Sequence, residues 1–168
     1  NYVENARFGV YLKDHILKSA TPRATYFEFE LRNNVFNVGT AGFISTIKGS
    51  PNVASGSNYV HHNIMYGFTD DSGNGATNGS PSVPGATFRF DHNVVDQTGI
   101  NPGTGFGVYG HEDVRSQGNI FLTPSAYDFN ATRNSSNQIV GISFLTHSDY
   151  NLFSNPVFLM DHVYGPTS

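Results

Sequence analysis

Apolar residues along this chain alternate with polar ones in short runs. The clearest runs contain Phe27, Phe29 and Leu31; Phe88 and Phe90; Ile142 and Phe144. Period-two alternation is typical of strands that bury one face. No long pattern with a 3.6-residue period appears, and Gly and Pro interrupt every window. We therefore predict an all-β fold.

A motif of Asn followed by two apolar residues recurs along the chain. Its members are Asn34-Val35-Phe36, Asn63-Ile64-Met65, Asn93-Val94-Val95, Asn119-Ile120-Phe121 and Asn151-Leu152-Phe153. Successive Asn residues are 29, 30, 26 and 32 residues apart. Asn5, 29 residues before Asn34, is the candidate for the first member of the series. One supersecondary unit recurring at such intervals is the sequence signature of a solenoid.

Each repeat is expected to hold a strand, a tight corner at the Asn, a second short strand and a loop. Asn suits the corner because its side chain tolerates a left-handed backbone and hydrogen-bonds locally. Stacked Asn side chains can also bond to one another along the stack. We predict a right-handed parallel β-helix of about six turns, forming one domain over residues 1–168. The alternative is an antiparallel sandwich or jelly roll, whose connections do not require the same polar residue in every repeat.

Four phrases resemble the repeats of the pectate-lyase-like right-handed β-helix superfamily. They are residues 31–36 (LRNNVF), 89–95 (RFDHNVV), 117–121 (QGNIF) and 148–153 (SDYNLF). The resemblance implies a carbohydrate-active protein, since the superfamily contains polysaccharide lyases, glycoside hydrolases, epimerases, phage tailspikes and adhesins. Its members commonly run longer and carry an N-terminal cap. No terminal cap is evident here, so we expect a fragment of a longer helix or a unit that stacks on another copy.

The composition and charge of the chain limit the classes of partner that it is expected to bind. The net charge is −4, and its 9 basic residues form no stripe, so nucleic acid is a poor candidate partner. No apolar stretch approaches the roughly 20 residues that span a bilayer. The chain has no Cys and only 13% charged residues, against roughly a quarter in an average domain. Its polarity comes from Asn, Ser, Thr and Gly, which is typical of a secreted or cell-surface β protein.

Two stretches rich in Gly, Asn, Ser and Pro, residues 69–85 and 98–105, are predicted as long polar loops. Loops on a rigid scaffold commonly carry binding sites. The sequence also has three glycosylation acceptor patterns, at Asn78, Asn130 and Asn134, which matter only if the source glycosylates secreted chains.

A lyase acting on acidic polysaccharide is the first functional hypothesis. Cleavage by β-elimination needs a base that removes the proton beside a carboxylate, and cations that stabilise the charge developing there. The phrase around Lys18 resembles the lysine-bearing strand of some alginate- and chondroitin-cleaving β-helix lyases, which implies Lys18 as the base. Arg32, Arg89 or Arg115 would neutralise the uronate carboxylate. Ordinary surface cations are the alternative interpretation of all four residues.

Other side chains suit sugar binding or hydrolysis. Tyr66, Tyr109 and His111 are candidates for contacts with sugar rings. A glycosidase needs two carboxyl groups about 5–10 Å apart. Asp70 or Asp71, paired with Asp91 or Asp96 on a neighbouring turn, would provide them. The structural alternatives are that the aromatic residues pack in the core and that the Asp residues form turns.

Metal and proton-transfer chemistry has two candidate locations. Asp70 and Asp71 are adjacent and suit calcium, which accepts carboxylate and carbonyl oxygens. The second location is the set of histidines near the predicted strand ends: His61-His62, His92 and His111. Solvent-facing polar positions of a repeat would explain these histidines equally well.

A function without chemistry is the other hypothesis. An uncapped solenoid with sparse charges would serve as a rod, an adhesin or a filament subunit. Its end turns would pair head to tail, and a contact of that kind propagates instead of closing.

Overall fold

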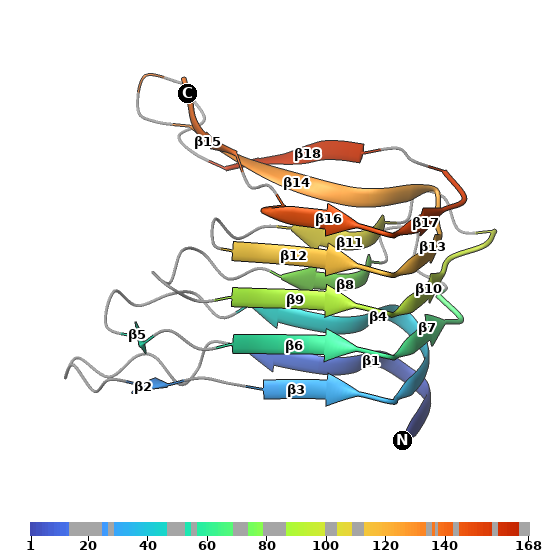
Figure 1. Ribbon diagram of the computed structural model, residues 1–168. Helices are drawn as coiled ribbons and strands as arrows, with labels where there is room; N and C mark the ends of the chain where they lie inside the picture. The colour runs from blue at the N-terminus through green and yellow to red at the C-terminus, as the bar shows by residue number, and fades with distance from the viewer. Residues whose placement is uncertain are drawn as a thin grey trace.

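The computed structural model consists of strands wherever it describes regular structure, and the described residues contain no helix. These residues are 1–13, 25–26, 29–46, 53–54, 57–68, 74–78, 87–99, 104–108, 113–133, 136, 138–142, 145–155 and 158–164. Lys18, Asp70, Asp71, Tyr109 and His111 lie outside them. The strands are stacked from the N-terminus at one end of the molecule towards the C-terminus at the other (Figure 1).

A five-stranded parallel sheet forms one side of the stack and faces the viewer in Figure 1. Its strands, in spatial order, are β3 (Phe29–Arg32), β6 (Ser57–His61), β9 (Thr87–Asp91), β12 (Asp113–Gln117) and β16 (His147–Asp149). Spatial order follows chain order, and each strand pairs with the strand of the next repeat.

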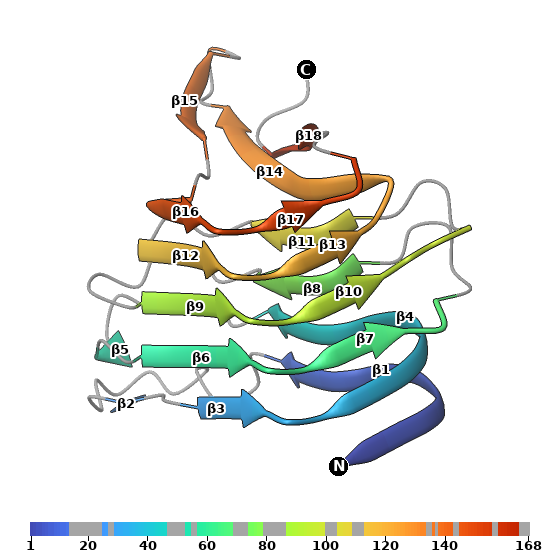
Figure 2. The same ribbon diagram turned by 45° about the vertical axis from the view of Figure 1, so that its right-hand side comes forward.

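The larger sheet contains two rows of short strands joined by long curved ones (Figure 2). The long strands are β1 (Tyr2–Lys13) and β4 (Val35–Thr46). The first row adds β7 (Ile64–Tyr66), β10 (Val94–Asp96), β13 (Ile120–Leu122) and β17 (Leu152–Phe153). The second row adds β8 (Asn74–Asn78), β11 (Thr104–Val108), β14 (Ser125–Arg133) and β18 (Phe158–Tyr164). β4 pairs with β7 through its first part and with β8 through its second.

Two smaller features complete the strand inventory. β15 (Ile139–Ile142) pairs antiparallel with β14, and it is the only antiparallel partner among the described strands. β2 (Thr25–Tyr26) and β5 (Val53–Ala54) form a separate parallel pair.

The pairing of the strands supports two features of the prediction, the all-β class and the parallel stacking of repeats. The chain is all-β over the described residues, and its strands pair with those about one repeat away, as Arg32 pairs with His61 and Asp91 with Gln117. This arrangement is compatible with a parallel β-helix. It contradicts the sandwich or jelly-roll alternative, whose strands pair antiparallel.

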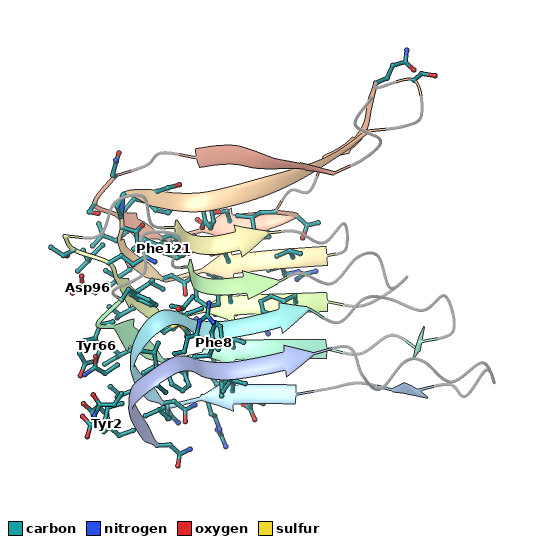
Figure 3. All side chains as sticks on the ribbon, turned by 180° about the vertical axis from the view of Figure 1, so that it is seen from behind. Tyr2, Phe8, Tyr66, Asp96 and Phe121 are labelled. Atoms are coloured by element: carbon teal, nitrogen blue, oxygen red, sulfur yellow. The ribbon has the colours of Figure 1, made fainter. Side chains whose placement is uncertain are left out.

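The interior between the sheets is apolar and stacked in register. Phe36, Met65, Val95 and Phe121 follow one another on β4, β7, β10 and β13, and all are at most 1% exposed. Opposite them, the core includes Val60, Phe90 and Val114. The rings of Phe90 and Phe121 lie 6.2 Å apart, across the two sheets. Figure 3 labels Phe121 within the stack, viewed from behind.

An asparagine ladder runs through the corner between the five-stranded sheet and the first row. Its members are Asn1, Asn34, Asn63, Asn93, Asn119 and Asn151. The Nδ2 of each of the first five members donates to the Oδ1 of the next member, at 2.9 to 3.2 Å. From Asn34 to Asn119, the backbone N–H of each member also donates to the Oδ1 of the next member. Stacking of the repeated Asn side chains was predicted and is observed.

Two details of the corner differ from the prediction. The left-handed backbone belongs to the residue before each ladder Asn: Asn33, His62, His92, Gly118 and Tyr150. The ladder Asn itself has no positive φ. The first ladder member is Asn1, and Asn5 instead has a φ of 57° at a register shift in β1.

The expected loops also contain strands. β8 lies inside residues 69–85, and β11 begins inside 98–105. Parallel partners flank β8 on both sides, β4 and β11, and they satisfy its backbone whatever the side chains are. A composition rich in Gly and Asn therefore did not prevent strand formation there.

Replacing a central ladder residue should destabilise the whole stack. The Asn93 side chain is fully buried, donates to Val60 O and Asn119 Oδ1, and accepts from Asn63. In Asn93→Ala the buried Asn63 N–H and the Val60 carbonyl each lose the hydrogen bond to this side chain, which costs about 1–3 kcal/mol each. Urea unfolding should therefore show a loss of at least about 2 kcal/mol. Asn155→Ala, which removes one exposed hydrogen bond to Pro124 O, should cost less than about 0.5 kcal/mol. Equal losses in the two variants would contradict a structural role for the ladder.

Candidate functional site: a polar sheet face

The outer surface of the five-stranded sheet carries two columns of polar and aromatic residues, which we call the polar face. The first column contains Glu30, Tyr59, Arg89, Arg115 and His147, and the second contains Arg32, His61, Asp91, Gln117 and Asp149. Side chains alternate along a strand, so the residues between the columns point inward. Val60, Phe90 and Ser116 accordingly are fully buried. The sheet thus aligns residues from five repeats on one surface.

A hollow of about 400 Å³ occupies the part of the polar face over β9, β12 and β16. Arg89, Asp91, Arg115, Gln117, Thr146 and His147 line it. Arg89 and Arg115 are direct neighbours in the parallel pairing of β9 with β12. Two arginines and one aspartate leave this hollow with a positive charge that suits an anionic group.

Arg89 is held in place from two sides. Its Nη2 lies 2.6 Å from Asp91 Oδ2, and its guanidinium lies over the Tyr59 ring at 4.4 Å from the ring centroid. The Asp91 carboxylate is almost wholly buried, which strengthens the ion pair with Arg89. Burial raises the pKa of Tyr59, and the negative charge of Asp91 raises it further. Tyr59 therefore stays a neutral ring beneath Arg89 and favours a cation–π contact.

Imidazoles and a carboxylate gather at the other end of the polar face. His61 Nε2 lies 2.8 Å from Glu30 Oε1, and Arg32 Nε lies 3.7 Å from the same oxygen. His61 also stacks on Tyr59, with ring centroids 3.9 Å apart. The hydrogen bond with His61 lowers the pKa of Glu30, and the charge of Arg32 adds to that effect. Glu30 is therefore ionised at neutral pH.

The structure brings together three of the residues predicted from chemistry: Arg89, Arg115 and Asp91. Arg32 lies on the same face, but beside Glu30 and outside the lining of the hollow. Tyr66 lies apart from them, on β7 of the other sheet, with its hydroxyl 3.4 Å from that of Tyr2. Figure 3 shows these two tyrosines near the same edge of the molecule.

The paired-carboxylate hypothesis stays a prediction, because Asp70 and Asp71 lie outside the described residues. Asp91 is engaged by Arg89, and Asp96 lies on β10 of the other sheet. Asp96 Oδ1 accepts hydrogen bonds from Thr98 N and Oγ1, which is a turn-forming role. Within the described ranges, no group of three or more His, Asp or Glu side chains is placed to hold a metal ion.

Sequence reasoning missed Glu30, Tyr59, Gln117 and His147. A usable signal was present, because the first column lies four residues before each ladder Asn and the second column two residues before it. Aligning the repeats on their Asn residues would have collected all ten positions.

Comparison with known proteins does not assign this chain to a family. No protein-family model, no curated protein and no solved structure matches this chain. No helix long and apolar enough to cross a membrane occurs in the part of the chain that the structure describes.

The contact between Glu30 and His61 should make the free energy of unfolding depend on pH in the acidic range. Because the pKa of Glu30 is lowered in the folded state, its contribution to stability is present above its ordinary value of about 4.5 and is lost as the pH falls through the lower, folded value. The stability difference between the wild type and Glu30→Gln should thus shrink as the pH falls from about 5 towards 3. Urea midpoints across this range measure it. A difference that stays the same or grows between pH 5 and pH 3 would contradict the assignment, and Glu4→Gln on β1 is the matched control.

Proposed function

We propose that this chain forms a secreted or cell-surface right-handed parallel β-helix that binds an acidic polysaccharide in the hollow of the polar face. The single observation that carries the proposal is the pair of neighbouring arginines, Arg89 and Arg115, in one hollow with Asp91. A general rule supports the right-handed sense of the helix, since crossover connections between parallel strands of one sheet are right-handed in about 98% of cases.

The side chains of the hollow match the groups of a uronate sugar. A guanidinium presents a planar fork of donors that fits a carboxylate. Asp91 and Tyr59 orient the Arg89 fork, and Arg115 pairs with Arg89 on the next strand, so both guanidiniums lie at the same hollow. Gln117 and His147 add hydrogen-bonding groups suited to hydroxyls. A polymer lying along the stack would meet one row of side chains about every 4.8 Å.

We propose β-elimination as the reaction, with Arg115 and Arg89 neutralising the uronate carboxylate. Neutralisation lowers the barrier for removing the neighbouring proton, because charge accumulates on the carboxylate as that proton leaves. Lys18 is the proposed base on the basis of family resemblance. As the proton leaves, a C=C bond forms in the sugar and the bond to the glycosidic oxygen breaks. The departing oxygen takes up a proton from water, and an unsaturated sugar remains at the new chain end.

Binding to polygalacturonate or alginate oligomers tests the proposal. Arg115→Ala should weaken binding at least tenfold, because a hydrogen bond to a charged group contributes about 1.5–3 kcal/mol. Arg32→Ala, on the same face but outside the hollow, should change affinity less than twofold. Lys18→Ala should keep binding and lose the ultraviolet-absorbing unsaturated product. Wild-type affinity in Arg115→Ala, or equal affinity for a neutral glucan, would contradict the proposal.

One observation favours the non-enzymatic structural solenoid as a second candidate. The first row of strands carries an outward apolar column next to the ladder: Tyr2, Val35, Ile64, Val94, Ile120 and Leu152. Ile64, Ile120 and Leu152 are 44%, 37% and 61% exposed. A straight, uncharged column of this kind suits lateral packing between rods.

Sedimentation measures whether the column mediates self-association. If the structural function holds, the wild type should form assemblies at micromolar concentration, and the double variant Ile64→Thr, Ile120→Thr should remain monomeric. Threonine retains the β-branched shape that strands favour. A wild type that stays monomeric, or a variant that assembles equally well, would contradict the structural function.

A further inference from the structure

Three imidazoles meet at the corner where β6 and β9 end, next to the ladder. His62 and His92 occupy equivalent positions, each immediately before a ladder Asn and each with a φ of 54°. Their ring centroids are 5.1 Å apart. His61 joins them from the polar face, with its Nδ1 2.7 Å from His62 Nδ1. The ends of β6 and β9 lie one above the other in both ribbon views (Figures 1 and 2).

The hydrogen bonds fix where the protons of the neutral imidazoles lie. The ionised Glu30 carboxylate can only accept, so His61 donates from Nε2. His61 Nδ1 then carries a lone pair and must be the acceptor in its contact with His62. His62 therefore donates from Nδ1, and its Nε2 presents a lone pair. Since His62 is exposed, that lone pair belongs to an accessible ring.

His92 has room to stand beside His62 because glycine follows it in the stack. Gly118 takes the next equivalent position, with a φ of 64°. A Cβ at Gly118 would lie 2.4 Å from His92 Nδ1 and 2.6 Å from its Cε1. Any larger residue at this position would displace the His92 ring. Glycine here thus provides both the left-handed backbone and the space for an imidazole.

We propose that His62 and His92 form a binding site for a divalent transition-metal ion of the zinc class, with water completing its coordination. Neutral imidazole is a preferred ligand of zinc and its neighbours in the first transition series. Two imidazoles bound to one tetrahedral ion at about 2.0–2.1 Å place their ring centroids roughly 5 Å apart, close to the observed 5.1 Å. This site is separate from the polysaccharide hollow and does not depend on the proposed function.

His61 and Glu30 act as positioning residues for this site. Histidine ligands usually donate their second ring nitrogen to an acceptor that fixes the ring and increases ligand basicity. His62 does so to His61, and His61 in turn does so to Glu30. Losing such outer partners typically weakens metal binding 10–100-fold.

Calorimetric titration of the full chain with Zn²⁺ tests the site. We expect one saturable ion, at least tenfold weaker binding in His62→Asn and in His92→Asn, and about tenfold weaker binding in Glu30→Gln. Asparagine is the chosen replacement because Asn33 already occupies the equivalent left-handed position. His147→Ala, an exposed imidazole elsewhere on the polar face, should bind zinc as the wild type does.

A second readout separates ligand loss from misfolding. Zinc that binds only the folded chain should raise the thermal midpoint of the wild type and of His147→Ala. It should raise that of His62→Asn and His92→Asn much less, while their midpoints without zinc stay near the wild-type value. Absence of zinc binding by the wild type would overturn the proposal. Unchanged binding in both asparagine variants would overturn it as well, because the ion would then lie elsewhere.

Discussion

The hydrogen-bonded chain of asparagine amides at the sheet corner is the constraint on which the other features depend. A buried amide has to satisfy its donors and acceptor, and each ladder Asn does so with the Asn of the next repeat and with backbone carbonyls. The ladder therefore fixes the register of every turn on the next. A slip of one residue would leave these amides unpaired and would turn Phe90 outward and Arg89 inward.

The register of the strands explains how repeats of only loosely similar sequence align charged and polar side chains on one surface. Positions four and two residues before each Asn face outward on the same sheet, so Arg115 of one turn meets Arg89 and Asp91 of the turn before it. The position immediately before each Asn is left-handed in every described repeat after the first. That position holds His62 and His92 and permits only residues that tolerate such a backbone.

Sequence patterns predicted the strands, the Asn repeat and its stacking, because alternation and periodicity report directly on which side chains are buried. The same patterns placed the left-handed residue one position too late, since Asn33 and Asn34 are both asparagines and composition does not distinguish them. β8 was missed because its stability comes from flanking strands and not from its own residues. Tyr59 and His147 were missed because residue type alone does not show that they share a column with Arg89.

Local arrangement, and not total charge, determines what the polar face can bind. The chain carries a net charge of −4, which disfavours a polyanion at long range, although salt screens that repulsion beyond about 8–10 Å. Within the hollow, Asp91 is buried and paired with Arg89, so the two guanidiniums of Arg89 and Arg115 together give the surface that a ligand meets its positive charge. Affinity for acidic sugars should consequently depend on Arg115 more than on any change of distant surface charge, and the imidazole pair at the corner contributes a separate, neutral set of ligands.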